Sequence, residues 1–170
     1  PEIALEVLGK YLPSEFRDDL KIISTPIDWL GLNYYTRSLI KGYKSNDGIN
    51  YECLRGDLKK TDMDWEFYPQ GLGYFIERIH HEYNKKIPIY ITENGMANKD
   101  FLNEKNEIID EDRIEYLDLH LKEVLKCLNK GIPIKGYFAW SLMDNYEWSF
   151  GYEKRFGMVY VDYQSFKRIP

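Results

Sequence analysis

The sequence is poor in cysteine and has neither a long apolar run nor a basic stretch, and each absence excludes a class of protein. Its two cysteines, Cys53 and Cys127, lie far apart and show no CxxC or Cys/His ligand spacing, which predicts no metal site and a reducing, cytoplasmic setting. No segment approaches the roughly 20 apolar residues that cross a bilayer, and none resembles a signal peptide. The formal charge of −5 is spread without a basic block, so we expect a soluble protein that does not bind nucleic acid.

Aromatic side chains, in contrast, are abundant. They make up 16% of the residues, with 15 Tyr and 4 Trp among 170, which disfavours disorder because such rings bury enough surface to offset chain entropy. Many of them are grouped around Asn, Asp and Glu. Sugars present apolar C–H faces ringed by hydroxyls, so sugar sites combine stacking rings with carboxylates and amides. The composition therefore fits both a carbohydrate site and a Tyr-rich core.

Three short apolar segments, 27–35, 88–92 and 132–139, are predicted to be buried strands. Polar side chains gather where each of them ends. Residues 41–64 are polar and contain several glycines, which predicts a long surface loop. The opening residues 3–9 look like the tail of a helix, so we expect the sequence to be cut from a longer chain.

Two amphipathic segments lie between the predicted strands. The first begins at Pro69, ends near Asn84 and has one apolar helical face, formed by Leu72, Phe75, Ile76, Ile79 and Tyr83. The second follows Asp110 as N-cap, stops at Gly131 and has an apolar face formed by Ile114, Leu117, Leu121, Val124, Leu125 and Leu128. The resulting order of strand, helix, strand, helix and strand predicts an α/β fold with a parallel sheet.

Chemistry in such folds lies at the edge of the sheet where the strands end. The side chains at this edge would be Asn33, Tyr34 and Tyr35 from the first strand, Glu93 and Asn94 from the second, and residues 140–148 after the third. No glycine-rich phosphate fingerprint follows any of the three strands, which argues against nucleotide binding. Carboxylates, amides and aromatic rings that converge in this way favour a catalytic or sugar-binding site.

Several motifs at these positions resemble glycoside hydrolase family 1, the family of β-glucosidases and β-galactosidases. Residues 91–95 read ITENG and are similar to the nucleophile motif of that family. Residues 28–36, DWLGLNYYT, resemble the segment of its sixth strand, and residues 140–157 resemble the sugar-binding segment of its eighth strand. Residues 65–72 and 110–121 are similar to the intervening stretches. The resemblance covers nearly the whole chain in collinear order.

The resemblance implies a (β/α)₈ barrel of which residues 1–170 form the C-terminal part, with about the last three strand–helix units. In that barrel Ile89, Ile91, Ile134 and Phe138 are expected to face the interior. Carried over residue by residue, the resemblance implies that Glu93 is the nucleophile, that Tyr35 hydrogen-bonds it and that Asn33 lines the same pocket. Trp140 would stack beneath the sugar, and Phe156 would close the apolar side. Glu147 would accept hydrogen bonds from the outer hydroxyls, and Trp148 would donate one from its indole N–H.

A retaining glycosidase sets two carboxyl groups about 5 Å apart, one attacking the anomeric carbon and one protonating the leaving oxygen. The family carries the second carboxyl in an Asn-Glu-Pro motif after the fourth strand, and this motif does not occur here. Asn103-Glu104-Lys105 is the nearest string, but it follows the nucleophile and is out of order. We therefore expect a β-glucosidase acting on a small β-glycoside or oligosaccharide, without metal or cofactor, that needs a missing N-terminal part and is inactive as this fragment.

Two alternatives stand beside this interpretation. Members of the family that act on 6-phosphorylated sugars place Ser where Glu147 stands, followed by a Lys and a Tyr. Here the Lys is present as Lys154, but the other two positions hold Glu147 and Phe156. Two of the three positions therefore favour an unphosphorylated sugar. The other alternative is a non-catalytic product of a truncated gene. The histidines fall on predicted helices and are interpreted as solvated or structural: His80, His81 and His120.

Overall fold

The computed structural model describes residues 5–6, 8–45, 48–83 and 86–170, and the chain divides into two compact units. One unit lies within residues 1–28 and 38–56, and the other comprises residues 29–37 and 57–170. The strand-end motifs fall in the second unit, apart from Asp28. The helix tail expected over residues 3–9 and the helix end expected near Asn84 lie partly or wholly outside the described residues.

The first unit holds a short helix and a β-hairpin. Helix α2, Phe16–Ile23, follows a 3₁₀ turn, η1, Gly9–Tyr11. Strand β2, Leu39–Ser45, pairs antiparallel with β3, Gly48–Leu54, so the loop predicted for residues 41–64 is wrong over its first half. An antiparallel ladder is held by backbone hydrogen bonds that polar residues make as well as apolar ones, and composition alone hides it.

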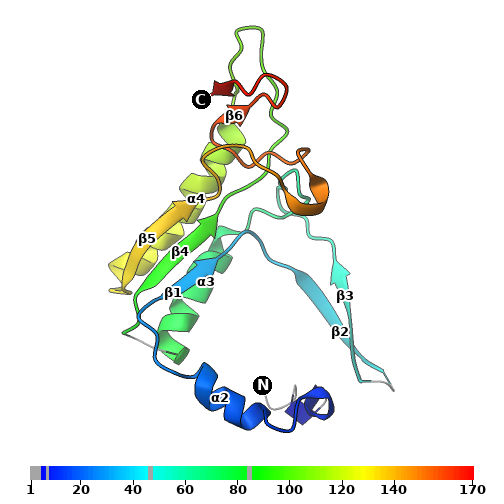
Figure 1. Cartoon of the computed structure of the whole chain (residues 1–170), viewed down its shortest axis with the longest axis vertical. Coiled ribbons are helices and arrows are strands. Elements are labelled where there is room, and N and C mark those ends of the chain that lie inside the picture. The colour runs from blue at the N-terminus through cyan, green and yellow to red at the C-terminus, as the bar shows by residue number, and fades with distance from the viewer. Residues whose placement is uncertain (1–4, 7, 46–47, 84–85) are drawn as a thin grey trace. The chain divides into compact units, whose positions relative to one another are not determined.

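The second unit contains the predicted parallel sheet (Figure 1). Strands β1, Leu30–Asn33, β4, Ile89–Asn94, and β5, Ile134–Ala139, pair in parallel in the order β1-β4-β5. Helix α3, Pro69–Arg78, continues into a π-helical turn, η2, Ile79–Tyr83, and leads to β4, while α4, Glu111–Asn129, connects β4 to β5. The predicted alternation of three strands and two helices is confirmed.

Both helices cover the same face of this sheet (Figure 1), and one hydrophobic core fills the space between the layers. The strands contribute Ile89, Ile91 and Ile134, all buried, which pack with Leu72 and Ile76 of α3 and with Val124 and Cys127 of α4. The expectation that these three isoleucines face a barrel interior is therefore wrong. Side chains alternate along a strand, and the large aliphatic ones point to the helices here.

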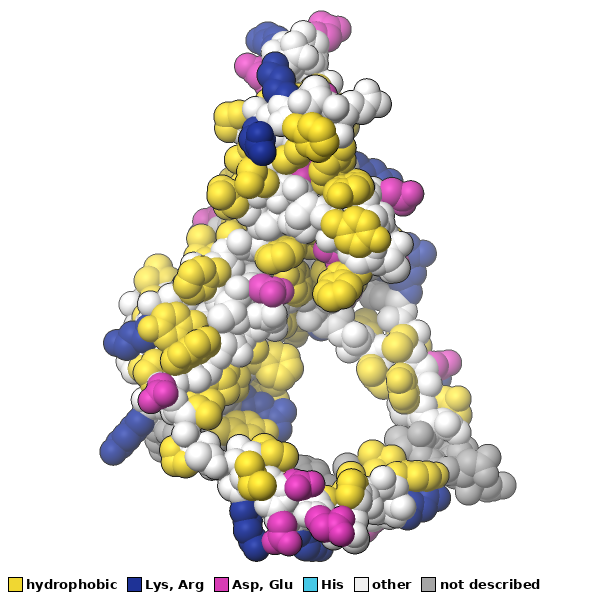
Figure 2. All heavy atoms as spheres, in the orientation of Figure 1, with side chains coloured by type: hydrophobic (Ala, Val, Ile, Leu, Met, Phe, Trp, Pro, Cys, Tyr) yellow, Lys and Arg dark blue, Asp and Glu magenta, His cyan; other side chains and the backbone are white. Residues whose placement is uncertain are grey.

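The opposite face of the sheet is open and aromatic. A hollow of about 520 Å³ lies on it, lined by Trp29, Tyr90, Thr92, Phe138, Ala139 and Trp140. Phe138 is 57% exposed and lines this hollow, so it lies on the sheet face that a (β/α)₈ barrel turns to its interior, as expected. Figure 2 shows hydrophobic side chains spread over the sheet on the viewer's side. Because β1 and β5 are both edge strands of this sheet, the open face is flanked by two unpaired edges.

Helix α4 buries a face that matches the predicted one only in part. Its buried side chains are Arg113, Tyr116, His120, Val124 and Cys127, whereas Ile114 is 66% exposed and Leu121, Leu125 and Leu128 are also exposed. The prediction holds for Val124. Elsewhere on the helix polar side chains are buried instead, because Arg113 pairs with Asp100 and the Tyr116 hydroxyl bonds to Asn94 and Tyr35. On α3 the prediction holds for Leu72 and Ile76 but not for Phe75, which is exposed.

The chain after β5 is mostly irregular. It includes a 3₁₀ turn, η3, Trp148–Phe150, and a two-stranded antiparallel pair, β6, Tyr160–Val161, with β7, Arg168–Ile169. Among the described residues, no helix has the length and apolar character that crossing a membrane requires.

Candidate active site

The ends of β1 and β4 bring the first predicted site residues together. The Tyr35 hydroxyl donates a 2.7 Å hydrogen bond to Oε2 of Glu93, and Oγ1 of Thr92 donates a 2.6 Å bond to Oδ1 of Asn33. The pairing of β4 with β5 is irregular between Ile91 and Asn94, so side chains no longer alternate strictly between the two faces of the sheet at these residues. As a result Thr92 and Glu93 are both partly exposed, while Asn94 is fully buried.

Three ionisable groups at this edge influence one another. Burial raises the pKa of Tyr35, and its hydrogen bond to the Glu93 carboxylate raises that pKa further, so the hydroxyl stays protonated as a donor. Burial also raises the pKa of Glu147, and the negative charge of Glu93 adds to this shift. The effect places Glu147 in the electrostatic environment of Glu93.

Aromatic rings surround the Tyr35–Glu93 pair. The ring centroid of Tyr35 lies 5.4 Å from that of Trp65 and 6.1 Å from that of Phe156, and Trp65 and Phe156 are 6.2 Å apart. Phe156 is buried, and Trp65 is half-buried. The sequence predicts a site position for Phe156 but not for Trp65. In the sequence, Trp65 is marked only by lying in the segment 65–72 that resembles the family. Its contact with Tyr35 cannot be seen there, because the two residues are far apart in the chain.

Trp140 follows β5 and contacts the chain after Glu93 through its backbone. Its N–H donates a 2.9 Å hydrogen bond to the Asn94 carbonyl, its side chain lines the open hollow, and its peptide bond to Ser141 is cis. Gly95 lies so close that a Cβ built on it would be 1.7 Å from the Trp140 carbonyl oxygen. Only glycine fits at this position, which accounts for the glycine in the ITENG segment.

One carboxylate closes the loop that carries Glu147 and Trp148. The fully buried Asp144 side chain accepts hydrogen bonds from the Arg155 guanidinium, from Gly157 N at 3.0 Å and from Val161 N at 3.1 Å. Trp148 is 82% exposed, with φ at 41°, a backbone region that side chains other than glycine rarely adopt. Asp144 was not predicted as a site residue, and its role is visible only from the folded loop.

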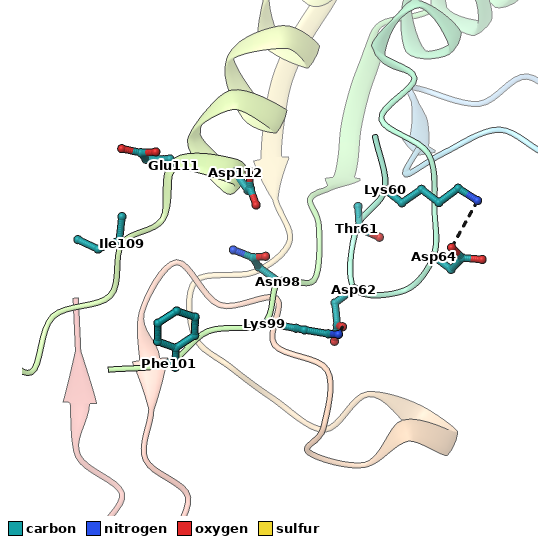
Figure 3. A pocket seen from close by; sticks show the side chains of 10 residues that line it. All are labelled: Lys60, Thr61, Asp62, Asp64, Asn98, Lys99, Phe101, Ile109, Glu111 and Asp112. Atoms are coloured by element: carbon teal, nitrogen blue, oxygen red, sulfur yellow. Dashed lines mark ion pairs between the residues drawn. The ribbon is translucent and has the colours of Figure 1, made fainter. Parts of the chain in front are cut away.

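Lys154 lies in the same loop and is engaged by Asp62. Its Nζ donates to Asp62 O at 2.6 Å and to Asp62 Oδ2 at 2.9 Å, and the side chains are 19% and 8% exposed, respectively. Asp62 also borders a charged hollow of about 740 Å³ (Figure 3), whose other lining residues include Lys60, Lys99 and Asp112. Within the described part of the chain, no group of three or more His, Cys, Asp or Glu side chains is arranged to hold a metal ion.

The histidines lie apart from this edge. His120 is fully buried in α4, where its Nδ1 is 2.7 Å from the Tyr116 carbonyl and its ring stacks on that of Tyr116. Burial lowers the pKa of His120 to about 4, so the ring is neutral at physiological pH. His120 is thus a structural residue, and His81 is exposed, as the sequence predicts.

A family model described as glycosyl hydrolase family 1 matches residues 1–170 of the chain. The chain belongs to glycosyl hydrolase family 1. Among family members, β-glucosidase A of Thermotoga maritima is 44% identical over 169 residues, and the match covers 99% of this chain but 37% of that protein. A 6-phospho-β-galactosidase of Clostridium acetobutylicum is 40% identical over 167 residues, which cover 88% of this chain and 35% of that protein.

Solved structures of the family agree with this membership. The structure of the Thermotoga maritima β-glucosidase in complex with deoxynojirimycin matches with a TM-score of 0.91 at 44% identity, covering 99% of this chain and 38% of that one. The chain thus spans less than two fifths of the length of the relatives it matches. Its parallel strands and covering helices are part of a (β/α)₈ barrel, as the sequence predicts.

Proposed function

We propose that residues 1–170 form the C-terminal part of a single catalytic barrel of a retaining β-glycosidase, and that the preferred substrate is a terminal, non-reducing β-glucosyl residue of a small glycoside or oligosaccharide. The observation that carries the proposal is the 2.7 Å hydrogen bond from Tyr35 to Glu93 at the C-terminal edge of the sheet. A carboxylate held by one donor, with its other oxygen left for reaction, suits a nucleophile.

In this mechanism Oε1 of Glu93, the oxygen that Tyr35 does not bind, attacks the anomeric carbon, the bond to the leaving oxygen breaks, and a glycosyl-enzyme ester forms. A second carboxyl group gives its proton to the leaving oxygen and then takes a proton from the water that hydrolyses the ester. The hydrogen bond from Tyr35 holds the Glu93 carboxylate in one orientation. Glu147, when ionised, is an acceptor to which the sugar hydroxyls can donate.

The remaining predicted residues supply the sugar contacts in this proposal. Asn33 lines the pocket with its amide, Trp140 stacks beneath the sugar ring, and Phe156 closes the apolar side beside Tyr35. Glu147 accepts hydrogen bonds from the outer hydroxyls, and Trp148 donates through its indole N–H. The high exposure of Trp148 fits a side chain that gains its contacts when substrate is bound.

We further propose that an N-terminal segment outside this chain completes the barrel and carries the acid/base carboxyl. The open aromatic face of the sheet, its two unpaired edges and the 38% coverage of the Thermotoga maritima structure support this. A three-stranded sheet has no opposite wall, whereas a barrel needs all eight strands to close. Below, the full-length protein means one that contains both that segment and this chain.

A 6-phospho-β-glycosidase is the second candidate, supported by the 40% identity to the enzyme of Clostridium acetobutylicum. Two side chains, Glu147 and Lys154, favour the unphosphorylated sugar instead. Glu147 would repel a phosphate, and the ammonium of Lys154 is engaged by Asp62. In the non-catalytic alternative, no Asn-Glu-Pro segment would precede Pro1 in frame, so sequencing upstream of Pro1 separates that alternative from the enzyme.

The test uses the full-length protein and an aryl β-glucoside. We expect hydrolysis with retention, followed by NMR of the first-formed sugar anomer, and we expect Glu93→Gln to lose several orders of magnitude in kcat. Glu104→Gln is the matched control, because Glu104 is an exposed glutamate in the loop after β4 and should leave kcat unchanged. Inversion of the anomer, or near-parental turnover by Glu93→Gln, would contradict the proposal.

A further inference from the structure

The residue after Glu93 is the centre of a buried hydrogen-bond network. Asn94 has no exposed surface; its Nδ2 donates to Tyr34 O at 2.7 Å and to the Tyr116 hydroxyl at 3.2 Å. Its Oδ1 accepts a 2.6 Å bond from the Tyr137 hydroxyl. One amide therefore joins the segment after β1, helix α4 and strand β5, immediately beside the proposed nucleophile.

The Tyr116 hydroxyl extends this network to Tyr35. It accepts the hydrogen bond from Asn94 and uses its own proton to donate a 2.7 Å bond to the Tyr35 carbonyl. Burial raises the pKa of Tyr116, so this hydroxyl keeps its proton. Tyr35 is thus held at two points, by its carbonyl through Tyr116 to Asn94 and by its hydroxyl to Glu93.

The ring of Tyr116 is itself fixed. It is fully buried, stacks on His120 with centroids 3.9 Å apart, and meets the edge of Phe67 at 5.2 Å. A hydroxyl on so constrained a ring has little freedom to move, which makes it a rigid anchor for the backbone of Tyr35. Tyr116 has no exposed surface, so its role does not depend on contact with a sugar.

We propose that Tyr116 is a positioning residue for the Glu93 nucleophile, acting by holding the backbone of Tyr35 so that the Tyr35 hydroxyl stays on the Glu93 carboxylate. The inference rests on the proposed function. It predicts that loss of the Tyr116 hydroxyl weakens the Tyr35–Glu93 hydrogen bond without removing it. A carboxylate held less firmly attacks more slowly, while the sugar contacts remain, so kcat falls and KM changes little.

The experiment compares Tyr116→Phe with Tyr34→Phe in the full-length protein. Both changes remove one buried tyrosine hydroxyl, but that of Tyr34 donates to the Tyr68 carbonyl and has no bond to Asn94 or Tyr35 among the described contacts. We expect Tyr116→Phe to lower kcat/KM about 10- to 100-fold, because small misplacements of catalytic groups have effects of that size. The loss should fall on kcat and not on KM, whereas Tyr34→Phe should keep both values near those of the parent.

A double-mutant cycle with Tyr35→Phe identifies the route of the effect. If Tyr116 acts through Tyr35, the double variant is hardly slower than Tyr35→Phe alone; independent effects would multiply and overturn the proposal. An unchanged kcat in Tyr116→Phe, or a Tyr35→Phe variant as fast as the parent, would overturn it as well. Rates are normalised to sites titrated with a 2-deoxy-2-fluoro-glucoside that has a good leaving group, so partial misfolding does not obscure the result.

These outcomes are distinct from failure of the proposed function. A full-length protein that hydrolyses no β-glycoside, or a Glu93→Gln variant that remains active, refutes the function itself. A slow Glu93→Gln and a slow Tyr35→Phe together with an unaffected Tyr116→Phe refute only the positioning role.

Discussion

The ammonium of Lys154 is bound to Asp62, with Nζ 2.9 Å from Oδ2 and 2.6 Å from the backbone carbonyl. Asp62 is itself almost fully buried, so the pair is shielded from water more than a surface ion pair would be. In relatives that act on 6-phosphorylated sugars, the resemblance implies that a lysine at this position meets the phosphate. Here the positive charge of Lys154 is paired with Asp62, which lies in the loop before α3.

The first prediction concerns this pair and Glu147. We expect Glu147→Ser to weaken glucoside turnover and improve use of a 6-phosphoglucoside, because a carboxylate about 4 Å from a phosphate costs about 1 to 4 kcal/mol at effective dielectrics of about 80 to 20. Adding Asp62→Asn should improve phosphoglucoside use further, because it removes the charge that neutralises Lys154. The measurement is the ratio of kcat/KM values for the two substrates in the full-length protein.

The matched control for Asp62→Asn is Asp64→Asn. It removes a carboxylate from the same loop, one that pairs with Lys60 at 3.4 Å. Discrimination between the substrates should respond to Asp62 and not to Asp64. Equal responses would indicate a general charge effect, and no response to Glu147→Ser would show that Glu147 does not face the outer hydroxyls of the sugar.

The second prediction is a pH dependence of stability that originates at His120. Burial lowers its pKa from 6.5 to about 4 in the folded protein, so the unfolded chain binds a proton more readily. The contribution of neutral His120 is complete above pH 6.5 and is lost as the pH falls from 6.5 to about 4, by up to roughly 3 kcal/mol.

His120→Phe keeps the stacked ring and removes the titrating group. Urea midpoints measured between pH 4 and 7 should therefore depend less on pH in His120→Phe than in the parent. His81→Phe is the control, because His81 is exposed, and its pH dependence should match the parent's. Parallel curves for His120→Phe and the parent would rule out His120 as the source.

The third prediction is that Gly95→Ala prevents folding of the strand-end region. The new Cβ would lie 1.7 Å from the Trp140 carbonyl oxygen, and a backbone atom cannot move aside as a flexible side chain can. We expect a destabilisation on the order of 3 kcal/mol or more, seen as a loss of soluble full-length protein or a large fall in melting temperature. Gly42→Ala, whose Cβ would meet only Asn50 O at 4.0 Å, should express like the parent.

The fourth prediction is that residues 1–170 alone have no significant glycosidase activity and associate or precipitate. The sheet exposes two edge strands and an aromatic face that includes Trp29 and Phe138, and surfaces of this kind promote aggregation. Size-exclusion chromatography and an aryl β-glucoside assay test this directly. Activity regained on mixing with the N-terminal segment would support the proposed half-site, whereas a monodisperse chain that turns over substrate unaided would contradict it.

Local sequence patterns predicted the sheet well. Short apolar segments bounded by Pro88 and by Gly131 gave β4 and β5, and polar residues after each strand gave the edge where Tyr35 and Glu93 meet. These features are local, because a buried strand needs an apolar run and a parallel sheet puts its strand ends on one side.

Contacts between distant segments were not predictable in the same way. The buried Tyr116 hydroxyl has Asn94 and the Tyr35 carbonyl as partners, and the ring of His120 stacks on Tyr116. Nothing in the helical pattern of α4 indicates these contacts. Counting apolar residues finds Val124, which is buried, but it also selects Leu125, which is exposed. Trp65 was missed for the same reason, since its neighbours Tyr35 and Phe156 are far from it in sequence.

The Asp144 carboxylate has a consequence for how sugar preference can diverge. It ties both ends of the loop by accepting hydrogen bonds from Arg155, Gly157 and Val161, while Glu147 and Trp148 lie between those ends. Neither Asp144 nor any of its three donors lies within residues 145–154, so we expect substitutions at Glu147 and Trp148 to leave these hydrogen bonds in place. Sugar preference can then diverge at those two side chains without rebuilding the strands, while Lys154 keeps the loop attached to Asp62.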